Sequence, residues 1–355
     1  MKFNKLVLTL LAGSLFFVSC SDDDDNNAPS GAYDNGVLVL NQGNFNSGNA
    51  SVSYISNAFA VENNIFSTNN QNLPLGDVGQ SVGLEGNNAY IVVNNSNKIE
   101  VVNRYTFAPV ATLSTGLTNP RYIAFENGKA YVTCWGDGTI TTDDYIAIID
   151  LATNTVSTTR IPVAEGPEKI IEEDGKLYVA HRGGYGFGNS VTVINTVNNV
   201  IVTTITVGGI PGSLEEENGT LYVLSEGYPS YAPAETAGSL TRINMANNTV
   251  ISTTDFAGTT HPANLVIEDG ALYYTVNNAI FKGGLINAVL PTTPLFTADI
   301  PSGTGLTAFD VEDNHIYIGS GSFSANGSVG VYSLTGALQQ TLTVGIAPVG
   351  FYFND

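Results

Sequence analysis

The sequence predicts an all-β protein, a β-propeller of seven blades with four strands in each blade. Three observations support this prediction. A hairpin motif recurs six times at intervals typical of propeller blades, no helical segment separates the copies, and the chain ends carry the halves of a seventh hairpin. Gly, Thr, Asn and Val also dominate the composition, where a helical bundle would use Glu, Lys, Leu and Ala.

The repeated motif is an apolar strand, an acidic or Asn-Gly turn, and a second strand that carries a tyrosine. The tyrosines are 41 to 51 residues apart and are Tyr90, Tyr131, Tyr178, Tyr222, Tyr273 and Tyr317. Asn-Gly and Asp-Gly are strong hairpin signals because both turn residues must accept a positive φ. Each interval adds a third strand, such as 145–149, and a fourth, such as 156–159. A β-solenoid would have a much shorter period, and an immunoglobulin-like array about twice this one.

The ends of the chain supply the seventh blade. Residues 35–43 match the second half of the hairpin motif, and residues 347–353 match its first half. We expect these halves to pair in one shared blade with the C-terminal strand innermost, because this closure removes the free sheet edges of an open ring. The propeller is therefore predicted to span residues 35–355.

The first twenty residues have the pattern of a secretion signal. Two lysines precede an apolar stretch, 6–18, which has the length of a signal-peptide core and is too short to span a membrane. Residues 17–20 resemble a bacterial lipobox, so residues 1–19 are expected to be a lipoprotein signal peptide and Cys20 the lipidated residue. The alternative is an ordinary secretory signal that happens to contain a cysteine.

Residues 20–34 are predicted to form an acidic tether. They include four consecutive aspartates, Asp22 to Asp25, and such a charge run is usually a solvated linker. Directly after a lipidated cysteine, the run resembles the signal that sends lipoproteins of Bacteroidota-type bacteria to the outer face of the outer membrane. We therefore expect a domain at the cell surface that contacts the membrane through its lipid anchor only.

The loops that join the second and third strands of each blade form the candidate binding site. In a propeller these loops share one face, and here they set aromatic side chains among Gly, Ser and Asn. Aromatic area beside adaptable polar groups is typical of binding surfaces. The alternative is that Phe45, Phe187 or Phe323 packs under its own loop. The candidate ligand-binding residues are Asn44, Phe45, Trp135, Arg182, Tyr185, Phe187, Tyr228, Tyr231 and Phe323.

The chain is acidic, with 32 Asp and Glu against 12 Lys and Arg and a formal net charge of −20. Such a chain would repel a phosphate backbone, so no nucleic-acid partner is expected. Two cysteines rule out a disulfide scaffold, and 43% hydrophobic residues suffice for a core. Many of the acids are expected in the hairpin turns, opposite the binding loops: Glu126, Glu172, Glu173, Asp174, Glu215, Glu216, Glu217, Glu268, Asp269, Glu312 and Asp313.

Signals for catalysis or for a bound metal are weak. The chain has no zinc-ligand spacing, no Gly-x-Ser-x-Gly motif and no phosphate loop. His181 and His261 lack a carboxylate partner at fixed spacing, and Asp137, Asp143 and Asp144 are better explained as solvated loop residues than as calcium ligands. A lyase or lactonase would need a metal in the central channel, and the inner strands lack a repeated inward-facing Asp, Glu or His. We expect no enzyme activity, metal or cofactor.

The repeats resemble the YncE-like group of propellers. Together with Cys20, the acidic tether and the segments 39–45 and 50–54, the chain is similar to the surface lipoprotein propellers that accompany TonB-dependent outer-membrane transporters. The best-known members of that group capture cobalamin. The resemblance implies a non-catalytic protein that binds a corrinoid at the cell surface and passes it to such a transporter. A surface propeller that binds a protein or a glycan is the alternative.

Overall fold

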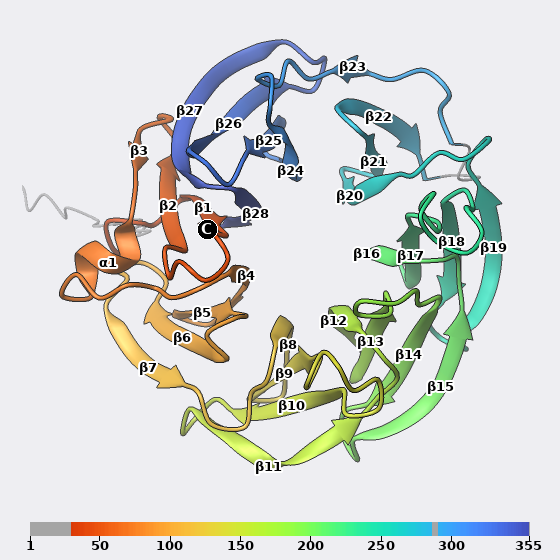
Figure 1. Cartoon of the computed structure of the whole chain (residues 1–355), viewed down its shortest axis with the longest axis horizontal. Helices are drawn as coiled ribbons and strands as arrows, with labels where there is room; N and C mark the ends of the chain where they lie inside the picture. Colours follow the sequence, from red (N-terminus) through yellow and green to blue (C-terminus); the bar gives the residue numbers. More distant parts are fainter. Residues whose placement is uncertain (1–29, 286–289, 355) are drawn as a thin grey trace, which may run out of the picture.

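The computed structural model describes residues 30–285 and 290–354. Within these residues the chain forms seven four-stranded antiparallel sheets, which stand around a central axis as the blades of a propeller (Figure 1). The predicted fold is therefore confirmed. The predicted signal peptide, the lipidated Cys20 and Asp22 to Asp25 lie outside the described residues.

The blades are numbered here in chain order, and each is written from its innermost to its outermost strand. Blade 1 is β28 (Pro348–Phe353), β1 (Gly36–Asn41), β2 (Ser51–Ser56) and β3 (Val61–Glu62); blade 2 is β4 (Gly79–Glu85), β5 (Asn88–Val93), β6 (Lys98–Asn103) and β7 (Pro109–Leu113); blade 3 is β8 (Pro120–Glu126), β9 (Lys129–Cys134), β10 (Tyr145–Asp150) and β11 (Thr155–Pro162); blade 4 is β12 (Pro167–Glu173), β13 (Lys176–His181), β14 (Ser190–Asn195) and β15 (Val200–Thr206); blade 5 is β16 (Pro211–Glu217), β17 (Thr220–Ser225), β18 (Ser239–Asn244) and β19 (Thr249–Asp255); blade 6 is β20 (Ala263–Glu268), β21 (Ala271–Val276), β22 (Ala279–Gly284) and β23 (Phe296–Thr297); blade 7 is β24 (Gly305–Glu312), β25 (His315–Gly321), β26 (Asn326–Ser333) and β27 (Leu338–Ile346).

One short helix, α1 (Ile65–Asn69), is found in the described part of the chain, where it connects blade 1 to blade 2. No helix among the described residues is long and apolar enough to cross a membrane.

The six repeat tyrosines lie on the second strands of blades 2 to 7, and none is more than 6% exposed. Their rings belong to the apolar layers between neighbouring blades: Tyr178 of blade 4 shares a cluster with Leu214 and Leu221 of blade 5. The turns before them adopt the predicted left-handed conformation, with φ of 52° at Asn218 and 72° at Gly219. The tyrosine spacing therefore marks the blade-to-blade packing.

The ring closes as predicted, because β28 pairs with β1 inside blade 1. Asn354, which follows β28, is fully buried. Its side-chain amide donates hydrogen bonds to the carbonyl oxygens of Tyr33 (2.5 Å) and Arg104 (2.9 Å), and its carbonyl accepts one from Arg104 Nε (2.5 Å). Its main-chain N–H bonds to the oxygen of Gly36 at 2.8 Å. One side chain thus connects both chain ends to blade 2.

The packed domain includes residues of the predicted tether. Tyr33 is 3% exposed, and its ring contacts those of Tyr54 and Phe107 edge-on at centroid distances of 5.3 and 5.5 Å. Its main-chain N–H bonds to the oxygen of Tyr105 in the turn between β6 and β7. The chain therefore joins the propeller at this turn.

We expect the substitution Asn354→Ala to destabilise the ring. It removes three side-chain hydrogen bonds and leaves two carbonyl groups without their donor, which should lower the free energy of unfolding by about 3 kcal/mol. Urea denaturation measures this change. The exposed Asn57→Ala serves as the control and should change stability by less than about 0.5 kcal/mol. Equal stability of the two variants would contradict the closing role of Asn354.

Candidate functional site

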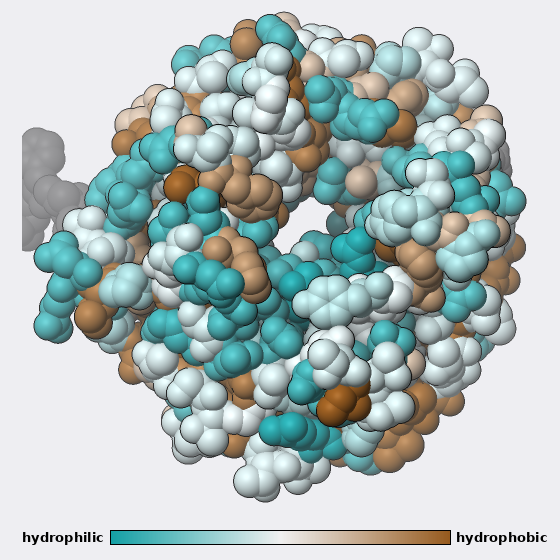
Figure 2. Space-filling view, in the orientation of Figure 1, coloured by the Kyte–Doolittle hydropathy of each residue, from teal (hydrophilic) through white to brown (hydrophobic). Residues whose placement is uncertain are grey.

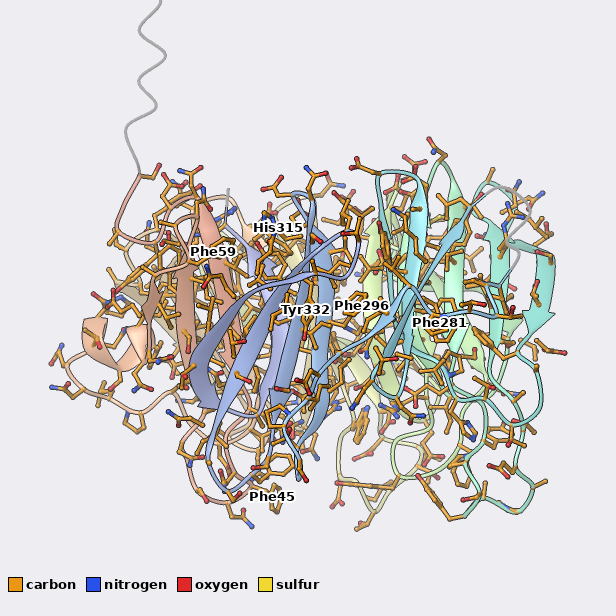
Figure 3. All side chains as sticks on the ribbon, turned by 90° about the horizontal axis from the view of Figure 1, so that it is seen from above. Phe45, Phe59, Phe281, Phe296, His315 and Tyr332 are labelled. Atoms are coloured by element: carbon orange, nitrogen blue, oxygen red, sulfur yellow. The ribbon has the colours of Figure 1, made fainter. Side chains whose placement is uncertain are left out.

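The loops between second and third strands all lie on one face of the propeller, which we call the loop face. Each starts beside the beginning of its own innermost strand: the N–H of Trp135 bonds to Asn119, that of Arg182 to Gly166, and that of Glu226 to Ile210. The hairpins between first and second strands lie on the opposite, hairpin face. Figure 3 shows Phe45 at the loop face and His315, which begins β25, toward the other.

A first group of candidate residues is built on blades 3 and 4. Trp135 is half-buried, and its indole N–H donates to the oxygen of Pro167 at 3.0 Å. The guanidinium of Arg121 stacks 4.1 Å from the centre of the Trp135 ring and forms two hydrogen bonds to Glu168, of 2.9 and 2.7 Å. Trp135 is therefore held from both sides and acts as a positioning residue for the loop.

Tyr185 extends from this group into solvent. Its ring meets Trp135 edge-on at 5.7 Å and remains 81% exposed. It lies directly over Gly138 of the neighbouring loop, where a Cβ atom would come within 2.5 Å of the tyrosine ring. A glycine at this position allows the close approach of the two loops, which presents Tyr185 without covering it.

A second group joins blades 4 and 5. The Phe187 ring contacts Tyr228 at a centroid distance of 5.5 Å and Tyr231 at 6.2 Å, and Tyr231 is 83% exposed. Arg182, also a candidate, lies 3.8 Å from the carboxylate of Glu226, and both side chains are about one-third exposed. Aromatic rings from the loops of blades 4 and 5 therefore contact one another in this group.

A third group lies on blades 7 and 1. Asn44 donates a hydrogen bond from its side chain to the carbonyl oxygen of Phe323, so the two loops are tied together. Phe45 and Phe323 are 67% and 56% exposed, so neither is covered by its own loop. The turns of blades 2 and 6, at 94–97 and 277–278, are short. The candidate residues therefore form two sets, one on blades 3 to 5 and one on blades 7 and 1. Blades 2 and 6 separate the sets, and the hollow of the propeller lies between them.

The innermost strands enclose a central channel of about 640 Å³. Figure 2 shows its opening, with hydrophilic side chains gathered around it and hydrophobic ones scattered on the surrounding loops. The mouth at the loop face is lined by Gln42, Gln80, Arg121, Glu168, Arg182 and Glu226, and the deeper wall by Tyr122, Lys169, Glu215, Asp310 and Tyr352.

The assignment of eleven acids to the hairpin turns is right for Asp174, Asp269 and Asp313 and wrong for the glutamates, which lie on the strands that lead into these turns. Glu215 was expected in a hairpin turn, but it lies within β16, and its side chain lines the channel. The turn begins only at Asn218, because the strand continues through the run of three glutamates. Burial raises the pKa of Glu215 to about 8 and that of Asp310 to about 7. The alternation of β-strand side chains was the available signal, but the acidic run obscured it.

The histidines and the loop aspartates have structural partners. His181 is 2% exposed, its Nδ1 lies 3.0 Å from the oxygen of Ala164, and burial lowers its pKa to about 4. Asp143 accepts the N–H of Asp137, and Asp144 accepts that of Gly166. Among the described residues, no three or more His, Cys, Asp or Glu side chains are placed to hold a metal ion.

Comparison with known proteins identifies a family for this chain. The family described as "Domain of unknown function (DUF5074)" matches residues 35–324. No curated protein matches the sequence.

Solved structures share the fold. Hydrazine synthase of Kuenenia stuttgartiensis has 16% identity and a TM-score of 0.58 over 75% of this chain and 86% of its own. The dihydro-heme d1 dehydrogenase NirN has 12% identity and a TM-score of 0.55, over 91% and 76%. BamB from Moraxella catarrhalis has 15% identity and a TM-score of 0.52, over 89% and 85%. These similarities establish the propeller fold.

We expect Trp135 and Tyr185 to differ sharply as sites of substitution. Trp135→Ala removes the surface on which Arg121 stacks and should cost about 3 kcal/mol of stability. Tyr185→Ala trims an exposed ring and should change stability by less than about 0.5 kcal/mol. Thermal and urea unfolding measure both. Equal losses would show that Tyr185 is part of the packed core of the loop.

The channel carboxylates should make stability depend on pH. The folded-state pKa of Glu215 lies above its ordinary value of 4.5. Its contribution to the free energy of unfolding is therefore fully present below about pH 4.5 and is lost as pH rises through about 8. Glu215→Gln, which does not titrate, removes this pH-dependent loss of stability. The stability of the variant relative to the wild type should therefore increase between pH 6 and pH 9 in urea unfolding. A difference that does not change with pH would contradict the assignment.

Proposed function

The chain belongs to the DUF5074 family, and we propose that it is a non-catalytic binding protein that captures a corrinoid such as cobalamin at its loop face. In this proposal the protein is lipid-anchored through Cys20 at the cell surface and passes the ligand to a TonB-dependent outer-membrane transporter. One observation carries the proposal: exposed aromatic rings, Tyr185, Tyr231 and Phe45, share the loop face with the polar mouth of a central channel.

The chemistry of this face suits a corrinoid. Such a ligand has a broad flat ring edged with neutral amide groups, so it needs apolar contact and many uncharged hydrogen-bond partners. Exposed tyrosine and phenylalanine rings supply the contact area at low entropic cost, because each has only two side-chain torsions. The Ser, Asn and Gly residues of the same loops supply hydroxyl, amide and main-chain groups. Two separated sets of rings can hold a wide ligand from opposite sides of the mouth.

The point at which the chain joins the propeller supports presentation of this face. Tyr33 bonds to Tyr105 in the turn between β6 and β7. That turn lies on the hairpin face, since the N–H of Arg104 bonds to Asn87 in the first hairpin of blade 2. An anchor at Cys20 would therefore attach on the side away from Tyr185 and Tyr231 and leave the loop face open to ligand.

Isothermal titration with cyanocobalamin tests the proposal. The wild-type protein should bind at micromolar ligand or below. The double substitution Tyr185→Ala and Tyr231→Ala should weaken binding by at least about tenfold, since hot-spot aromatics typically contribute 2 kcal/mol or more. The melting temperature should stay unchanged, because both rings are exposed.

Val197→Ala is the matched control. Val197 is 85% exposed and follows β14 in the turn that leads to β15, on the hairpin face. Its substitution should leave affinity unchanged. Absence of cyanocobalamin binding at micromolar concentration would exclude the corrinoid. Binding that survives the double substitution would move the site away from the loop face.

A further inference from the structure

One position on the innermost strands differs strongly between blades. It is the residue paired with the repeat tyrosine or, in blade 1, with Leu38. In chain order from blade 2 to blade 7 and then blade 1, the residues are Gly83, Ala124, Ile171, Glu215, Val266, Asp310 and Tyr352. Only blades 5 and 7 of the described chain place a carboxylate there. Paired residues share a sheet face, so these two acids occupy equivalent positions around one channel.

The two carboxylates are poorly satisfied by the protein itself. Glu215 has no hydrogen-bond or ion-pair partner within the described residues, and Asp310 accepts one hydrogen bond, from the N–H of Val311 at 2.9 Å. Thr307, which lines the same channel, has a buried hydroxyl without a partner. Glu215 and Asp310 are half-buried and line the channel, so their carboxylates and the Thr307 hydroxyl can accept hydrogen bonds from a ligand within it.

Lys169 is the nearby cation, but it does not neutralise both acids. Its Nζ lies 4.3 Å from the centre of the Tyr122 ring and within 4 Å of no carboxylate in the described chain. At the mouth, Arg121 is already bound to Glu168, and Arg182 faces Glu226. The deep part of the channel therefore has two acids for one lysine.

We propose that the deep channel binds the primary ammonium group of a small organic cation, held between Glu215 and Asp310. An ammonium group donates three hydrogen bonds, which suits two carboxylates and a hydroxyl such as that of Thr307. An anion would meet the acidic excess, and no three or more His, Cys, Asp or Glu side chains of the described chain are placed to hold a metal ion. A cavity of 640 Å³ is within the range of small-molecule sites. This site is separate from the proposed corrinoid face.

Binding at this site should be coupled to protons. Burial raises the pKa of Glu215 to about 8 and that of Asp310 to about 7, and the charge of Asp310 adds to the shift at Glu215. An ammonium group must therefore displace a proton that the pair retains. The titratable groups that line the channel beside the pair are Lys169 on β12, Tyr122 on β8 and Tyr352 on β28. The charges of Glu268 on β20 and Glu312 on β24 also act on Asp310.

Isothermal titration of the purified protein with putrescine and with ethylammonium tests the inference, and 1,4-butanediol is the uncharged control. Affinity for the amines should rise between pH 6 and pH 8.5, by up to about tenfold per pH unit where one proton is released. The heat should also change with the ionisation enthalpy of the buffer. The diol should not bind.

Matched variants locate the site. Glu215→Gln and Asp310→Asn should each weaken amine binding at least tenfold at pH 8.5, and Lys169→Met should strengthen it by removing a competing cation. Glu217→Gln, two residues along β16 beside the exposed turn, should have no effect. The double substitution at Tyr185 and Tyr231 should leave amine binding intact, which separates this site from the corrinoid face.

Two results would overturn the inference. One is the absence of binding by either amine at millimolar concentration. The other is binding that does not depend on pH and survives both Glu215→Gln and Asp310→Asn, which would place the amine on the acidic surface. Glu215→Gln keeps the size of the side chain and resembles the neutral form that burial favours, so a folded variant is expected, and its circular dichroism spectrum checks this.

Discussion

The structure depends on the burial of each blade against its neighbours. A four-stranded sheet of this size cannot cover both of its own apolar faces, so the tyrosine layer of one blade is buried only when the next blade packs against it. Tyr178 with Leu214, and the five equivalent layers, are therefore satisfied only in a closed ring. The pairing of β28 with β1, and the contacts of Asn354 with Tyr33 and Arg104, provide that closure.

The closed ring also decides where chemistry can occur. Seven innermost strands converge on one axis, so side chains from distant segments such as Glu215 and Asp310 line the same channel. Loops from different blades are brought together in the same way. Trp135 packs against Arg121 and bonds to Pro167, and these contacts fix the loop that presents Tyr185. Rigid support beneath and exposed rings above are what a binding surface requires.

Much of this organisation could be predicted because it repeats. The Asn-Gly and Asp-Gly turns, the tyrosines and the half-motifs at the chain ends each carry local information about strand and turn. The positions of the candidate loops could be predicted from the same repeats, because each loop joins the second and third strands of a blade. The channel did not, because its composition varies from blade to blade: the equivalent position holds Gly83 in one blade and Glu215 in another. A repeated motif predicts only the features that the blades share, and the residue at this position is not one of them.

The sequence alone determined the seven-bladed fold, its closure and the loops that carry aromatic residues, because turn chemistry and strand alternation are local properties. Tertiary structure alone decided the role of each side chain. Trp135 and Tyr185 look alike in sequence, yet one is held under the loop and the other is 81% exposed. Glu215 looks like a turn residue, yet the continuation of β16 points it into the channel. Burial depends on neighbours distant in sequence, and only the assembled ring supplies them.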